Sequence, residues 1–451
     1  MTALIIIIFL IGYMLIAMEN LTKVNKTCIA LLMYVLTWSI YMIATDYAQS
    51  SLTSFSHHLA ETCETILFLM GAMTIVEVVD SNGGFNFVTR WLHSTRPSAM
   101  LWKTVGLTFI LSALLDNMTT AIVMTMVLRK LIADRQRRLL LVCMVVVAAN
   151  AGGAFSPIGD VTTIMLWIKG CVSAGGIITS LLLPSVVSIV IPVLIILPRF
   201  CRQSASSAIS MPDINPEGVP QEILQPFEQL NRPSQFSRGA RIAIFCIGVG
   251  GLMSVPLFHS ITGLPPFVGV TGVLALLWTV TELIIRYDSN ILSSDTTMRV
   301  ATQMKNIDIS TILFFLGILL TVGTLQETGT LNMIGSWLND TFSNVYIINS
   351  LIGLLSSVVD NVPLVASAMG MYDIQPAGVA EALQVYQQDG AFWQLLAYCA
   401  GTGGSLLIIG SAAGVVAMGL EDISFTWYMK HMTPLVLAGY LCGILCYWIL
   451  T

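Results

Sequence analysis

The sequence predicts an all-α polytopic membrane protein made of two inverted repeats. Apolar residues make up 55% of the 451 residues and charged residues only 10%, whereas about 25% of an ordinary soluble protein is charged. An Asp-Asn pair occurs twice, at 116–117 and 360–361, each time inside a long apolar run. A glycine-rich interruption also occurs twice, at 151–160 and 401–414. We expect five spanning helices and one re-entrant hairpin in each repeat, which makes about ten spans and two hairpins.

The composition also argues against several classes of protein. There is no block of basic residues, so we expect no nucleic-acid partner. The nine cysteines show no paired metal-binding spacing, and we expect neither a disulfide framework nor a cofactor. Residues 1–18 are apolar but lack a basic leader and a clear cleavage site, which favours a first spanning helix over a cleaved signal.

The first repeat is predicted to cover residues 1–198. A spanning helix needs roughly 20 mostly apolar residues, and Lys23 and Lys26 mark the turn after the first one. Residues 45–60 are predicted to form a polar loop that carries His57 and His58, and 85–92 a short interfacial piece. The predicted spans of this half are 4–17, 28–44, 62–79, the interrupted 139–168, and 177–197.

The first Asp-Asn pair lies in the apolar run 104–128, which has basic residues on both sides. Basic loops favour the cytoplasm, so both ends of this run belong on one side and it cannot span. We therefore predict a re-entrant hairpin at about 103–130, open to the cytoplasm, with its tip near Asp116-Asn117. Broken backbone at membrane depth is tolerated where it lines a cavity. Three glycines and a proline at 151–160 then break the next helix.

Residues 199–241 contain five prolines, and we predict a cytoplasmic linker between the repeats. The second repeat, 242–451, follows the same plan, with an outward-facing hairpin at about 344–371. Both chain termini are predicted to lie outside. The predicted spans of this half are 242–257, 267–285, 311–325, the interrupted 392–414, and 427–450.

The two halves align with each other by inspection. The segment 65–71 matches 311–317 at a spacing of 246 residues, and the Asp-Asn pairs are 244 residues apart. Gly152-Gly153 matches Gly403-Gly404 at a spacing of 251 residues. Five spans is an odd number, so the halves enter the membrane from opposite sides. Inverted repeats with paired broken helices are typical of secondary transporters, with the binding site near the bilayer midplane.

The predicted site contains three carboxylates, Asp116, Asp160 and Asp360, and no Lys, Arg or His in the two tips and two breaks. Hard cations such as Na⁺ and Li⁺ prefer oxygen ligands. Because Asp160 aligns with Ser411, we expect the cation nearer the first hairpin, held by Asp116, Asn117 and Asp160, with Asp360 as a further ligand. Neutral oxygens are available from Asn117, Thr119, Thr120, Ser156, Asn361, Thr402, Ser405 and Ser411.

The same carboxylates provide a means of coupling the cation to protons. Burial disfavours the charged form of a carboxyl group, and a second carboxylate nearby disfavours it further. A metal cation favours the charged form and expels a proton, so competition for one site is sufficient for exchange. Glu64 and Glu77 belong either to a proton path or to helix ends that face water. His57 and His58 are either pH sensors or solvated loop residues.

At these motifs the chain resembles the NhaD-type sodium/proton antiporters of the ion transporter superfamily. The resemblance rests on residues 115–121, 360–363, 151–160 and 410–414. It implies Na⁺(Li⁺)/H⁺ exchange in pH homeostasis, an elevator-type motion, a homodimer and a bacterial inner membrane. Dicarboxylate members of the superfamily carry Ser-Asn-Thr at their tips, where Asp116 and Asp360 stand here.

Two other readings of the sequence stay open. An arsenite or organic-anion transporter of the same superfamily shares similar tips, but it would need a cationic or neutral-donor site, which the three Asp oppose. An intramembrane enzyme would need a nucleophile and base or a metal cluster. No His lies in a span near the Asp residues, so we expect no enzyme.

Overall fold

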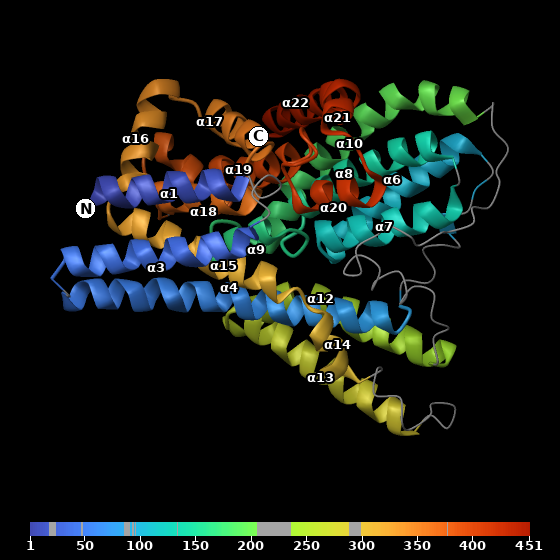
Figure 1. The fold of residues 1–451 in the computed structure, drawn as a ribbon, viewed down its shortest axis with the longest axis horizontal. Coiled ribbons are helices and arrows are strands. Elements are labelled where there is room, and N and C mark those ends of the chain that lie inside the picture. The colour runs from blue at the N-terminus through green and yellow to red at the C-terminus, as the bar shows by residue number, and fades with distance from the viewer. Residues whose placement is uncertain are drawn as a thin grey trace.

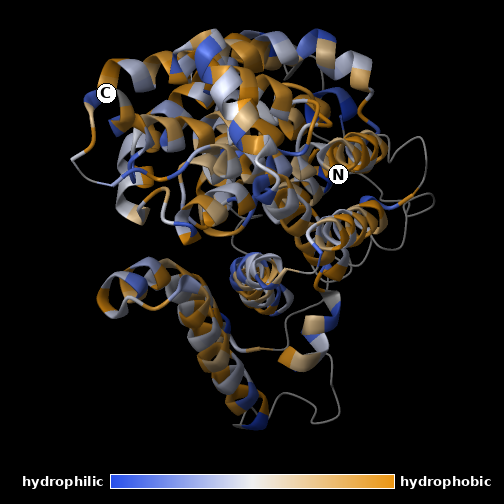
Figure 2. Ribbon diagram, turned by 90° about the vertical axis from the view of Figure 1, so that its left-hand side faces the viewer, coloured by the Kyte–Doolittle hydropathy of each residue, from blue (hydrophilic) through white to orange (hydrophobic). Residues whose placement is uncertain are grey.

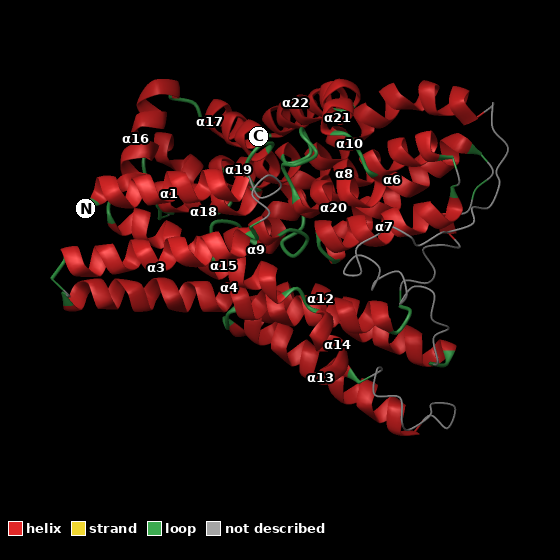
Figure 3. Ribbon diagram, viewed as in Figure 1, coloured by secondary structure: helices red, strands yellow, loops and turns green. Residues whose placement is uncertain are grey.

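The computed structural model describes residues 1–451 except 18–23, 47, 85–90, 93, 95, 133, 205–235, 288–298 and 377. The described residues form nineteen α-helices and two short 3-10 helices, and no strand (Figure 3). This confirms the all-α prediction. The predicted interfacial piece 85–92 and the predicted linker 199–241 lie for the most part outside the described residues.

Nine helices among the described residues are long and apolar enough to cross a membrane. Hydrophobic residues are abundant along the helices (Figure 2), and many of their side chains are exposed; Leu32 and Met253, for example, are 62% and 59% exposed. Such helices are suited to a lipid environment. The nine are α3 (Lys26–Ala44), α4 (Gln49–Ser81), α6 (Pro97–Leu114), α8 (Arg135–Ala154), α10 (Ala174–Ser204), α12 (Arg238–Thr262), α13 (Pro266–Tyr287), α15 (Ile309–Glu327) and α22 (Thr433–Leu450).

The other helices are shorter, and several of them are halves of predicted hairpins or broken helices. They are α1 (Thr2–Ala17), α7 (Asn117–Leu131), α9 (Val161–Ile168), α14 (Val300–Gln303), α16 (Thr330–Phe342), α17 (Val345–Ser356), α18 (Asn361–Met371), α19 (Ala391–Gly403), α20 (Ala412–Glu421) and α21 (Phe425–His431). The 3-10 helices are η2 (Met304–Asn306) and η3 (Glu381–Tyr386).

Two sequence-based predictions of secondary structure are wrong. Residues 45–60 are not a polar loop, because α4 begins at Gln49 and continues for 33 residues. Neither Gly nor Pro interrupts its first five turns, and the Thr53 and Ser56 hydroxyls donate to carbonyls four residues earlier. The last predicted span, 427–450, is two helices separated at Met432, where α22 begins with a proline in its first turn.

Helices at equivalent positions of the two halves make equivalent contacts, and several of these contacts join one half to the other. α3 packs on α1 and on α15, while α13 packs on α12 and on α4. Gly71 of α4 and Gly317 of α15, which match in the sequence repeat, both lie at these crossings. A Cβ atom would come within 2.5 Å of Val270 at Gly71 and within 2.6 Å of Ala30 at Gly317. The repeat therefore marks where the halves pack closely.

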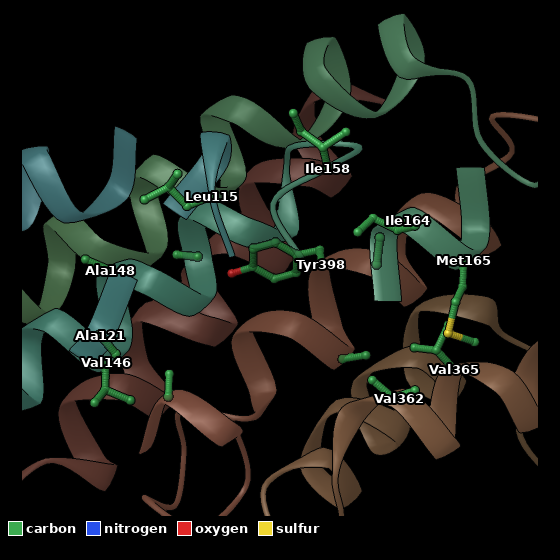
Figure 4. Packing of buried hydrophobic residues seen from close by; sticks show 14 of the residues in the cluster. Leu115, Ala121, Val146, Ala148, Ile158, Ile164, Met165, Val362, Val365 and Tyr398 are labelled. Carbon is green, nitrogen blue, oxygen red and sulfur yellow. The ribbon is translucent and has the colours of Figure 1, made fainter. Parts of the chain in front are cut away.

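The elements that carry the Asp-Asn pairs form a second, more central group. α6 and α7 pack on α8, and α17 packs on α19. α7 also packs on α20, and α18 on α9, so each predicted hairpin contacts the broken helix of the other half. In Figure 1, α6 and α7 extend towards one end of the molecule and α17 and α18 towards the other. Buried side chains such as Leu115 and Ile158 surround the breaks (Figure 4).

Candidate functional site

Four helices begin at the centre of the molecule, and each begins with a polar N-cap from the repeated motifs. Asp116 caps α7 and Asp160 caps α9, while Asp360 and Ser411 cap α18 and α20. Each side chain accepts a hydrogen bond from a backbone N–H in its helix, which stabilises the helix start. The donors are the N–H groups of Thr119 (2.7 Å), Thr162 (3.1 Å), Val362 (3.4 Å) and Gly414 (3.2 Å).

Glycines hold the broken helices against the hairpins. A Cβ atom on Gly152 would collide with the carbonyl oxygen of Phe109 in α6, and one on Gly403 with that of Gly353 in α17. At the same crossings, Ser112 Oγ donates to the Ala149 carbonyl (2.5 Å) and Ser356 Oγ to the Ala400 carbonyl (2.8 Å). The matching glycines of the two repeats therefore serve the same close backbone contact in each half.

Asp160 lies at the centre of the site, with an exposed fraction of 2%. Asn117 Nδ2 donates to its Oδ2 at 3.0 Å, and Asn361 Nδ2 donates to the same oxygen at 3.1 Å. An ionised carboxylate only accepts hydrogen bonds, so both amides present their NH₂ groups to it. The two Asp-Asn pairs thus meet on the carboxylate of the first broken helix.

Asn150 extends this network, although it is not among the residues predicted from the sequence. Its Oδ1 accepts from Asn117 Nδ2 at 3.1 Å, and its Nδ2 donates to Ser405 Oγ and Ser411 Oγ, both at 2.8 Å. Asn150 is fully buried. Its signal in the sequence is a polar residue that ends a long apolar run directly before the glycine break.

Asp116 and Asp360 are equivalent in sequence but have different partners. Both oxygens of Asp116 accept from Thr119, from its backbone N–H and from its Oγ1 (2.6 Å). Asp360 Oδ2 instead accepts from Lys26 Nζ at 3.0 Å. The expectation of a site without a basic partner is therefore wrong, because Lys26, at the start of α3, lies outside the four segments considered.

A cavity of about 320 Å³ joins these groups. Its walls include apolar side chains of α4, α12 and α15. The predicted site residues that line it are Asp116, Asn117, Asp160, Asp360, Asn361 and Ser411.

The remaining predicted neutral ligands do not line the cavity. Thr119 bonds Asp116, and Ser405 bonds Asn150. Ser156 Oγ donates to the Ala113 carbonyl (2.6 Å) and Thr402 Oγ1 to the Tyr398 carbonyl (2.5 Å), while Thr120 is fully buried. In the part of the chain that the structure describes, no three His, Cys, Asp or Glu side chains lie close enough to hold one metal ion. The three Asp therefore share a cavity without forming a compact cluster.

Glu64 and Glu77 lie away from this cavity. Glu64 lies in the middle of α4 and lines a second cavity of about 510 Å³, whereas Glu77 accepts from Ser81 Oγ at 2.8 Å near the C-terminal end of the helix. Thirteen residues of helix separate them, which is about 20 Å. A role in a proton path stays a prediction.

The two histidines lie on α4 rather than in a loop. His58 is buried and its Nε2 lies 3.1 Å from Glu327 Oε1 of α15, while His57 is exposed and lies 3.4 Å from Glu61. His58 is therefore not merely solvated, because it connects the two long helices. A role of either histidine in pH sensing stays a prediction.

Comparison with known proteins gives a consistent result over most of the chain. The family model described as citrate transporter (CitMHS) matches residues 13–386. Sodium/proton antiporter 2 of Arabidopsis thaliana is 40% identical over 441 residues, which cover 98% of each chain. Sodium/proton antiporter 1 of the same plant is 41% identical over 98% of this chain and 71% of its own length.

A bacterial relative and a solved structure extend the comparison. The Na⁺/H⁺ antiporter NhaD of Vibrio cholerae serotype O1 is 30% identical over 468 residues, covering 97% of this chain and 90% of its own. The YdaH transporter of Alcanivorax borkumensis has a TM-score of 0.57 at 12% identity and covers 90% of this chain and 89% of its own. At that identity, the likeness to YdaH is one of fold alone.

Proposed function

This chain belongs to the citrate transporter (CitMHS) family and, within the ion transporter superfamily, to its NhaD-type sodium/proton antiporters, and from that premise we propose that it exchanges Na⁺ against protons. The proposed site is the cavity shared by Asp116, Asp160 and Asp360. The observation that carries the proposal is the occupation of three of the four central helix N-termini by side-chain carboxylates.

A helix N-terminus carries roughly half a positive charge and attracts anions. Four such ends meeting in one cavity would suit an anionic substrate if they were capped by neutral groups. Here Asp116, Asp160 and Asp360 already supply the negative charge, so a citrate-like anion would meet carboxylates instead of free N–H groups. The carboxylate and amide oxygens that remain are ligands for a hard cation.

Asp160 is the group on which we propose that Na⁺ and protons compete. It is buried and receives amide donors from both Asp-Asn pairs. A cation that approaches it stabilises the ionised form, and the proton is released. Asn117 and Asn361 use their NH₂ groups to bond Asp160. Once Na⁺ neutralises Asp160 these donors are no longer required, and either amide could rotate to present its carbonyl oxygen to Na⁺ as a neutral ligand.

Several finer features are part of the proposal. Li⁺, which also prefers oxygen ligands, is proposed as a second substrate. Alternating access is proposed to come from an elevator-type motion of the hairpins and broken helices against α3, α4, α13 and α15. The homodimer, the bacterial inner membrane, pH homeostasis, outside termini and a cytoplasmic linker are proposed on the family resemblance and the distribution of basic residues.

The decisive experiment measures exchange directly. The purified protein is reconstituted into proteoliposomes that hold a pH gradient and a trapped pH dye, and Na⁺, Li⁺, K⁺ or choline is added. We expect Na⁺ and Li⁺ to dissipate the gradient, and K⁺ and choline to have no effect. No response to Na⁺ or Li⁺ from mildly acidic to alkaline pH would contradict the proposal.

The same vesicles test the anion alternative. Radiolabelled citrate or arsenite is added with and without Na⁺. Uptake of either anion, together with an absent proton flux on Na⁺ addition, would assign the chain to an anion transporter.

A further inference from the structure

Lys26 contacts an acidic and an aromatic side chain at the cavity. Its Nζ lies 3.0 Å from Asp360 Oδ2 and 4.4 Å from the centre of the Phe314 ring. The side chains of Lys26 and Asp360 are only 28% and 20% exposed. An ammonium group between a carboxylate and an aromatic face is stabilised by both. Lys26 lines the same cavity as Asp116 and Asp160.

The equivalent position in the second half of the chain offers Asp116 no such partner. α3 and α13 are equivalent in the repeat, since Ala30 contacts Gly317 where Val270 contacts Gly71. By that alignment Lys26 corresponds to Pro266 of α13. Among the described residues no ion pair involves Asp116. The two tips are therefore unequal in charge as well as in sequence.

On the basis of the proposed exchange, we propose that Lys26 is a tethered cation that competes with Na⁺ inside the site. Its ammonium occupies the carboxylate of Asp360, so an incoming Na⁺ is directed to Asp160 and the first tip. The same charge repels Na⁺ in the cavity, because like charges a few ångströms apart interact strongly in a partly desolvated space. Lys26 thereby sets the Na⁺ concentration at which the carrier is half saturated.

Other charged and titratable groups around Lys26 fit this role. Tyr13 of α1 and the three Asp are the titratable groups that line the cavity with it. α4, α12, α15 and α20 contribute apolar and neutral side chains there. Lys26 is thus the one cationic side chain among the described residues that line this cavity, and it belongs to α3 while its partner belongs to α18.

The test compares half-saturating Na⁺ concentrations in proteoliposomes for four proteins. Removing the ammonium in Lys26→Gln frees Asp360, and we expect the half-saturating concentration to fall roughly tenfold, which equals about 1.4 kcal/mol. In Asp360→Asn the ammonium is left without its partner, and the concentration should rise. The double variant removes both charges and should lie close to the wild type.

The control variants separate a charge effect from a structural one. Lys26→Arg keeps the charge and should retain the wild-type value, and so should Lys305→Gln, which removes an exposed charge outside the cavity. Size-exclusion profiles check folding, and the double variant leaves neither member of the Lys26–Asp360 pair without its partner.

Each outcome has a defined consequence. If the wild type is active and the half-saturating Na⁺ concentration of Lys26→Gln is unchanged or higher, the role of Lys26 is overturned. If the double variant needs as much Na⁺ for half saturation as Asp360→Asn does, then Asp360 is itself a Na⁺ ligand. That result would also overturn the role of Lys26. A wild type without any Na⁺ response would instead overturn the proposed exchange itself.

Discussion

Asp160 is the only one of the three site carboxylates that receives side-chain amides from both halves of the described chain. A buried ionised group is costly unless hydrogen bonds or a counter-ion compensate it. Two amide donors and the N-terminus of α9 supply that compensation when no cation is bound. Because both tips donate hydrogen bonds to Asp160, a change in its protonation alters the hydrogen bonding of both hairpins at once.

We predict that Asp160→Asn abolishes Na⁺-dependent proton flux, while Asp360→Asn only weakens it. The amide can neither release a proton nor neutralise Na⁺, whereas Asp360 is already paired with Lys26. Proteoliposome flux measures both variants. In the wild type, the half-saturating Na⁺ concentration should rise as the pH falls, because protons and Na⁺ compete for the same carboxylate. Full exchange in Asp160→Asn together with none in Asp360→Asn would reverse the assignment.

We predict that Asn150→Ala strongly reduces exchange and destabilises the protein by about 1–3 kcal/mol, because it removes three hydrogen bonds, to Asn117 and to two serines, from a buried site. The matched control is Thr402→Val, in the second broken helix. Its hydroxyl donates to the Tyr398 carbonyl four residues earlier in the same helix, so exchange should persist. Thermal unfolding in detergent and flux in vesicles distinguish the two, and equal losses in both variants would contradict the network.

The candidate site could be predicted in part from the residues themselves. Asp116, Asp160 and Asp360 are unusual in apolar runs, and an intramembrane carboxylate is a signal in any context. Lys26 and Asn150 carried no such signal. A lysine next to an expected turn looks like an interfacial residue, and a lone asparagine looks like a helix end. Only the folded chain brings Lys26 to Asp360 and Asn150 to Asn117, whose amide also donates to Asp160.

At the scale of elements, the broken helices are held by backbone contacts that only glycine permits. Gly152 and Gly403 face the carbonyl oxygens of Phe109 and Gly353. Backbone on both sides of such a crossing cannot move aside for a methyl group without shifting a helix. The glycines that recur in the two repeats therefore lie where helices cross in close contact.

We predict that Gly152→Ala and Gly403→Ala each abolish exchange and lower the unfolding temperature, because the added Cβ pushes α8 from α6 or α19 from α17. Gly106→Ala in α6 is the control, since nothing lies within 4 Å of a Cβ placed there. That variant should be neutral or more stable by up to about 1 kcal/mol, the helix preference of alanine over glycine. Thermal unfolding and flux measure all three, and a stable, active Gly152→Ala would contradict the crossing.

At the scale of the whole molecule, equivalent contacts run across the two halves, from α3 to α15 and from α13 to α4. Neither half completes its own packing. α6 and α7 extend opposite to α17 and α18 (Figure 1), as inverted repeats would, and an inverted arrangement in the membrane stays a prediction.

We predict that cysteines placed at Gln136 and Asp373 react with a membrane-impermeant maleimide from opposite sides of the membrane. Gln136 lies at the open end of the first hairpin, beside the start of α8, and Asp373 follows the second hairpin; both are exposed. The background must lack the exposed native Cys28, Cys63 and Cys246. Labelling of intact cells compared with everted vesicles gives the side, and labelling from the same side would contradict inverted repeats.

The sequence by itself determined that this is an all-helical membrane protein with an internal repeat, two Asp-Asn motifs and two glycine breaks. These features are local: apolar composition, helix-breaking residues and carboxylates in apolar runs are visible without a fold. Only the tertiary structure decided that both amides converge on Asp160, that Asn150 joins the breaks, and that Lys26 pairs with Asp360. Those contacts join residues 33 to 334 positions apart, and nothing in the local sequence specifies which distant helix will pack beside them.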